Sequence, residues 1–124
     1  MINTMASAED VKKMQNLIKQ KGKQMKLLTK EITKKAQKQY DKGSDMEQMV
    51  VAKFFGGNWT WYLMNLAEDK DYAWGIVDGH AVEMGSFSIS ELQNVKLKPF
   101  GLGIERDLYF EPVKAGELWK ELNA

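Results

Sequence analysis

The sequence lacks cysteine altogether and contains a single histidine, His80, a single arginine, Arg106, and two prolines. The absence of cysteine excludes disulfide bonds, thiolate nucleophiles and cysteine-bound zinc. A single histidine likewise excludes a metal site built from several histidines. We therefore expect the protein to use no metal and no other cofactor.

Long hydrophobic runs are also missing. No apolar stretch approaches the roughly 20 residues that are needed to span a bilayer. The first ten residues, MINTMASAED, lack the basic segment and the apolar stretch of a secretory signal. We expect a cytoplasmic protein with no membrane partner, and a length of 124 residues suits one hydrophobic core.

Positive and negative charges are divided unequally along the chain. Residues 1–42 contain eleven lysines and four acidic residues, whereas residues 43–124 contain seven basic and thirteen acidic residues. A basic N-terminal part indicates either contact with nucleic acid or a solvated helix beside an acidic domain. We prefer the second interpretation.

Apolar residues in the N-terminal part recur at helical spacing, three and four residues apart. This pattern predicts two helical segments, residues 8–21 and 28–41, with a stop at Gly43. We expect residues 1–24 to be a basic helical extension. Residues 25–124 are then a single α+β domain.

From residue 49 onwards the pattern changes to alternation, with many β-branched and aromatic residues. Four strands are predicted, in MVVAKFF, NWTWYLMNL, YAWGIV and VEMGSFSI. Two hairpin turns are expected, at Gly56-Gly57 and at Asp78-Gly79, because glycine adopts the positive φ that such turns require.

The C-terminal third adds shorter elements. A capping box that starts at Ser88 predicts a short helix in ISELQNV, RDLYFE predicts a fifth strand, and one or two helical turns close the chain. The predicted fold class is α+β: an antiparallel sheet of about five strands, two hairpins plus a C-terminal strand, with an N-terminal helix packed on it.

The segment KFFGGNWTWY contains five aromatic residues around the first turn. If Gly56-Gly57 forms that turn, one face of the hairpin is wholly apolar, and we assign its rings to the core. These rings are Phe54, Trp59 and Trp61. The opposite face is a candidate contact surface made by Lys53, Phe55 and Tyr62. Such a face can stack single-stranded bases, but covering by the basic helix explains it without a ligand, and we prefer covering.

A first group of polar candidates, Asp78, His80 and Glu83, surrounds the second predicted turn. A carboxylate there could orient the imidazole as a general base. Asp-Gly is also an ordinary turn sequence, however, and a histidine beside it needs no function. We prefer this structural interpretation.

A second group of polar candidates consists of Glu105, Arg106 and Asp107, followed by Glu111. An arginine flanked by acids after a Gly-rich loop could bind a carboxylate or a phosphate, or it could belong to an internal ion-pair network. We prefer the internal network. It predicts that Arg106 pairs with an acid of the second hairpin, such as Asp78 or Glu83.

Five segments occur in a fixed order along the chain: KLLTKEI, KFFGGNWTWY, WGIVDGH, MGSFSISEL and GLGIERDLYFEP. Together they resemble the domain of unknown function 2958 family over about residues 26–112. The resemblance implies a small bacterial, plasmid or phage product and assigns no activity to it. This chain departs from the family by its short Gly56-Gly57 turn, and residues before Met25 are expected to lie outside the resemblance.

Three functions are compatible with these observations. The preferred one is a non-enzymatic interaction protein of a phage or mobile element, an anti-defence inhibitor of anti-CRISPR or anti-restriction type that binds a host or element-encoded protein. The first alternative is a nucleic-acid-binding accessory protein that uses the basic N-terminal helices. The second alternative is an enzyme that uses His80 and the acids between Glu105 and Glu111.

Overall fold

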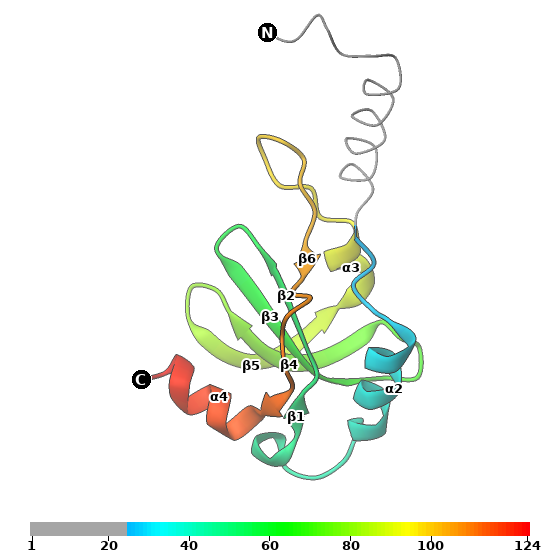
Figure 1. Cartoon of the computed structure of the whole chain (residues 1–124), viewed down its shortest axis with the longest axis vertical. Coiled ribbons are helices and arrows are strands. Elements are labelled where there is room, and N and C mark those ends of the chain that lie inside the picture. The colour runs from blue at the N-terminus through cyan, green and yellow to red at the C-terminus, as the bar shows by residue number, and fades with distance from the viewer. Residues whose placement is uncertain (1–24) are drawn as a thin grey trace, which may run out of the picture.

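The computed structural model describes residues 25–124. The predicted helix over residues 8–21 and the predicted extension over residues 1–24 lie outside the described residues. Figure 1 shows a twisted sheet with helices packed around it. The elements in chain order are α2 (Lys30–Gln39), the 3-10 helix η1 (Asp45–Glu47), β1 (Met49–Val50), β2 (Ala52–Gly56), β3 (Trp59–Leu66), β4 (Tyr72–Asp78), β5 (Val82–Ser88), α3 (Ile89–Gln93), β6 (Glu105–Arg106), β7 (Val113–Lys114) and α4 (Ala115–Leu122).

Five of the strands form one antiparallel sheet in the order β5-β4-β3-β2-β6. The predicted α+β class is confirmed, with α2 packed on the sheet mainly at β3. The fifth strand is shorter than predicted, since β6 ends at Arg106 and residues 107–112 form a turn and a loop. A separate pairing of β1 with β7 has no counterpart in the sequence prediction.

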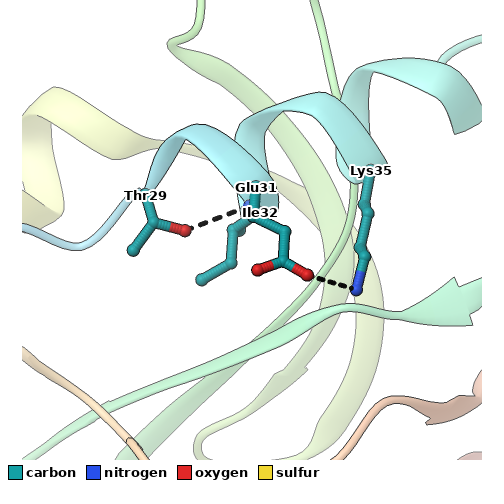
Figure 2. A network of polar contacts seen from close by, with 4 residues as sticks. All are labelled: Thr29, Glu31, Ile32 and Lys35. Carbon is teal, nitrogen blue, oxygen red and sulfur yellow. Dashed lines mark hydrogen bonds and ion pairs between the residues drawn. The ribbon is translucent and has the colours of Figure 1, made fainter.

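The helix α2 forms where its periodicity predicts it and is two residues shorter at each end than expected. Thr29 caps it, because its Oγ1 accepts a hydrogen bond of 3.1 Å from the backbone N–H of Ile32. Glu31 and Lys35, one turn apart, form an ion pair of 3.0 Å (Figure 2). The neighbouring stripe, with Ile32 and the buried Ala36, packs into the core.

The C-terminal end of α2 is fastened to the strands by Gln39. Its Nε2 donates to the carbonyl oxygens of Met49, at 2.9 Å, and of Met64, at 2.6 Å. Its Oε1 accepts a hydrogen bond of 2.7 Å from the N–H of Met49. One side chain therefore satisfies backbone groups of both β1 and β3.

The β2–β3 hairpin turns one residue later than the sequence predicts. Gly56 pairs with Trp59, so the turn consists of Gly57 and Asn58, and Gly57 has a φ of +58°. Gly56 is glycine for another reason: a Cβ there would collide with the side chain of Ile104. The register is shifted by two residues, for example to Phe54 opposite Trp61 instead of Trp59. Because side chains alternate with a period of two, this shift leaves the face of every residue unchanged.

The sheet separates two hydrophobic cores. The first lies on the face of Phe54 and Leu63 and includes residues of α2 and α3. The second lies on the face of Tyr62 and Ile76 and is closed by α4. The expectation that the basic helix covers the Lys53, Phe55 and Tyr62 face is therefore wrong: α2 covers the wholly apolar face, where burial stabilises more.

The aromatic residues assigned to the core divide by distance from the turn. Phe54 is fully buried, and Trp61 is partly buried against the first core. Trp59, in contrast, is 38% exposed, which contradicts its assignment to the core. It sits at the end of the hairpin beyond the reach of the helices, where it stacks on Trp61 with ring centroids 6.1 Å apart.

Residues 25–27 pass beside α3 and are held there by side chains from distant parts of the sequence (Figure 1). Leu27 is fully buried in the first core. Its N–H donates to Oε1 of Gln93 at 3.1 Å, and Nε2 of Gln93 donates to the carbonyl of Met25. We call residues 25–27 the anchored segment.

Candidate functional site

An open groove of about 560 Å³ lies where the end of the β2–β3 hairpin meets the segment 105–109. We call it the β6 groove. Five of the nine candidate residues predicted from the sequence line it, namely Lys53, Phe55, Glu105, Arg106 and Asp107. Its other lining residues were not predicted: Met25, Gly57, Trp59, Thr60, Leu108 and Tyr109.

Arg106 binds backbone carbonyls and not a carboxylate. Its Nη1 donates to the carbonyl oxygens of Lys26, at 2.6 Å, and Leu27, at 3.2 Å. The predicted pairing with Asp78 or Glu83 is wrong, because β2 and β3 lie between β6 and the strands that carry those acids. At about 4.8 Å per strand, Asp78 is three strand spacings away.

Asp107 ends β6 and shapes the turn that follows. Its N–H donates to the carbonyl of Lys53 at 2.9 Å, and its Oδ1 accepts a hydrogen bond of 2.9 Å from the N–H of Tyr109. An aspartate that binds the backbone two residues later makes an Asx turn. Leu108 and Tyr109 consequently project outwards, 63% and 92% exposed.

Lys53 connects the groove to the second core. Its Nζ lies 3.9 Å from Oδ2 of Asp107 and 5.8 Å from the centre of the Tyr62 ring. Tyr62 is only 7% exposed, so its assignment to a contact surface is not supported by its position. Burial raises the pKa of the Tyr62 hydroxyl, and the carboxylates of Asp78, Glu121 and Asp107 raise it further. Phe55, on the same face, is 39% exposed.

The candidates of the second hairpin do not form a catalytic arrangement. Asp78 lies opposite Val82 and Glu83 lies opposite Val77, which places the two carboxylates on opposite faces of the sheet. His80 is exposed, and its ring centre lies 5.2 Å from that of Trp59 in a T-shaped arrangement. Among the described residues it has no hydrogen bond or ion pair, so no carboxylate orients the imidazole.

A second open groove, of about 800 Å³, runs along the outer side of α2. We call it the lysine groove. Nine residues line it: Lys26, Leu28, Thr29, Lys30, Thr33, Lys34, Gln37, Lys38 and Lys70. No acidic residue is among them, and none of the five lysines forms an ion pair with another described residue. The sequence signal for it was present, since lysine recurs every four residues from Lys26 to Lys38.

Residues 25–124 contain neither a cluster of metal ligands nor a helix suited to a membrane. In that range no group of three or more histidine, cysteine, aspartate or glutamate residues is arranged to hold a metal ion. No helix in the same range is long and apolar enough to cross a membrane.

The fold and the two grooves define a small α+β protein that presents fixed side chains on open surfaces. A family model described as "Protein of unknown function (DUF2958)" matches residues 17–123, and the chain belongs to this family. The match is wider than residues 26–112 at both ends, so the expectation that residues before Met25 lie outside the resemblance is wrong for residues 17–24. No curated protein and no solved structure matches the chain.

Proposed function

We propose that this chain is a non-enzymatic interaction protein of a phage or mobile element, and that it binds a protein partner through the β6 groove. The observation that carries the proposal is the presentation of Tyr109 and Leu108 on a turn that Asp107 holds in place. Because the backbone of this turn is already fixed, a partner that covers it has only the side chains to order.

The composition of the groove favours a protein partner. Tyrosine, tryptophan and arginine are the residues that contribute most to binding at protein interfaces, and the groove is lined by Tyr109, Trp59 and Arg106. Its two cations are already engaged, because Arg106 binds two carbonyls and Lys53 pairs with Asp107. Glu105 is exposed and forms no ion pair with another described residue. A partner that covers the aromatic side chains and Leu108 therefore leaves neither cation unpaired.

The kind of partner follows from the family resemblance, which implies a plasmid or phage product. A protein of such an element that acts by binding has an evident target in the nucleases of host defence. We therefore propose an anti-defence role of anti-CRISPR or anti-restriction type. This step rests on association and not on the chemistry of the groove.

The test is capture of the partner from lysate of the native host by the tagged full chain, followed by mass spectrometry. Tyr109→Ala should remove the captured nuclease while the melting temperature stays unchanged, since Tyr109 is 92% exposed. The matched control is Tyr40→Ala, which removes another exposed tyrosine outside the groove.

The anti-defence role has its own readout. Expression of the chain should raise the plating efficiency of a phage that the host nuclease restricts, and Tyr109→Ala should abolish this protection. Equal capture by both tyrosine variants would show that the groove is not the binding site. Capture of a protein unrelated to defence would keep the groove and refute the role.

A further inference from the structure

The lysine groove has the geometry of a phosphate-binding track. Lys30, Lys34 and Lys38 lie on one side of α2 at intervals of four residues, which is about 6 Å along a helix axis. Lys26 continues the row before the helix begins, and Lys70 adds a charge from the β3–β4 turn. Five positive charges thus line one open channel.

The acids near this channel do not pair with its lysines. Glu31 is paired with Lys35 at 3.0 Å. In the turn that carries Lys70, Asp69 accepts hydrogen bonds from the N–H groups of Asp71 and Tyr72.

Asp71 itself binds Ser88 and Ser90. Glu68, the remaining acid of the turn, does not line the groove. No described acid therefore lines the channel or forms an ion pair with one of its lysines.

The lining residues distinguish between polyanions. Insertion into an anionic membrane requires apolar side chains beside the lysines, but Leu28 is the only apolar lining residue and the apolar stripe of α2 is turned into the core. Single-stranded nucleic acid is held largely by stacking of bases on aromatic rings, and no aromatic residue lines this groove. A duplex, by contrast, presents its phosphates outwards and needs only a row of cations.

We propose that the lysine groove binds the phosphate backbone of double-stranded DNA without sequence preference. The hydroxyl groups of Thr29 and Thr33, between the lysines, are able to donate further hydrogen bonds to phosphate oxygens. This site is separate from the β6 groove and does not depend on the proposed protein partner.

The experiment is a fluorescence anisotropy titration of the full chain against a 20-base-pair duplex DNA of mixed sequence, between 50 and 200 mM NaCl. The triple variant Lys30→Gln, Lys34→Gln, Lys38→Gln should weaken binding by on the order of tenfold or more. It should also reduce the slope of log K against log salt by about 2.7, which is 0.9 for each lost phosphate contact.

The matched control is Lys96→Gln, Lys98→Gln, Lys120→Gln, which removes the same charge from exposed lysines outside the groove. The five lysines of residues 1–24 remain in both variants, so their contribution cancels. A control that loses as much affinity as the groove variant would overturn the proposal, because binding would then follow net charge alone.

A second variant tests the groove without changing any residue of α2. Lys70 has a φ of +62°, a conformation that asparagine tolerates, so Lys70→Asn removes a charge without strain. It should reduce the salt slope by about 0.9. Tighter binding to single-stranded DNA of the same sequence, or to vesicles of phosphatidylserine and phosphatidylcholine, would refute the choice of duplex DNA.

Discussion

The two grooves handle charge in opposite ways. In the β6 groove the cations are engaged: Arg106 binds two carbonyls and Lys53 pairs with Asp107, while Leu108 and Tyr109 are left exposed. In the lysine groove the apolar side chains are packed away and the cations are free of described acids. A surface with satisfied charges favours an apolar contact, whereas one with unsatisfied charges favours a polyanion.

The anchored segment separates the two surfaces, since Met25 lines the β6 groove and Lys26 lines the lysine groove. The comparison holds only if this segment is a fixed part of the domain. Its removal should therefore have the largest effect. Deletion of residues 1–27 removes the buried Leu27 and leaves Gln93 and Arg106 without their partners, at a cost of about 3 to 5 kcal/mol of stability.

Deletion of residues 1–24 is the matched control, and it should leave the described domain folded because the anchored segment remains. Urea denaturation followed by near-ultraviolet circular dichroism measures both. If the shorter deletion unfolds the chain, residues 17–24 are part of the folding unit, as the family match at residue 17 permits. If the longer deletion is harmless, the segment does not separate the grooves.

A smaller effect is expected from Arg106→Lys. A lysine keeps the charge but has no planar fork, so it cannot serve two carbonyls with the geometry of a guanidinium. The variant should lose about 1 to 2 kcal/mol in urea denaturation, and Lys120→Arg should lose nothing. An unchanged melting temperature together with a lost protein partner would instead make Arg106 a binding residue. Its charge would then be available, and the contrast between the grooves would fail.

The smallest effect concerns pH. The pKa of Asp71 is held below its usual value, chiefly by the hydrogen bond from the backbone N–H of Ser90 and also by the hydroxyls of Ser90 and Ser88, against the opposing effect of desolvation. A depressed pKa contributes stability above the unfolded value of about 3.9, and this stability is lost as the pH falls through the folded pKa.

The stability difference between the wild type and Asp71→Asn should therefore be present at pH 7 and should shrink on acidification. Urea midpoints at a series of pH values measure it, with Glu68→Gln as the control. Asp71→Asn should leave the salt slope of DNA binding unchanged. A steeper slope would show that Asp71 partly neutralises the lysine groove and that its charges are less free than the comparison requires.

Much of the fold could be predicted because it depends on local patterns. The helix α2, the cap at Ser88 and the faces of the hairpin all follow from spacing within a few residues. The exact register could not be predicted, because either glycine suits a turn and the space beside Gly56 is filled by Ile104, which is distant in sequence. The residues of the hairpin alone do not indicate that Ile104 packs beside Gly56.

Only part of the site could be predicted from the sequence, and its hydrogen bonds could not. Five of the eleven residues that line the β6 groove were predicted, yet the partners of Arg106 depend on which strands are neighbours in the sheet. Tyr109 was missed because residues 106–111 were predicted to form a strand, whereas Asp107 starts an Asx turn there. In the lysine groove the row from Lys26 to Lys38 was visible in the sequence, whereas the contribution of Lys70 required the fold.

The hydrogen bonds of Gln39 fix the orientation of the helix that carries the lysine row. Because this side chain serves β1 and β3 together, α2 cannot swing away from the sheet without leaving backbone groups of both strands unpaired. The direction of the lysine row is thereby set relative to β2, and with it relative to Tyr109. A duplex and a protein bound at the same time would be held by this chain in one fixed orientation relative to each other.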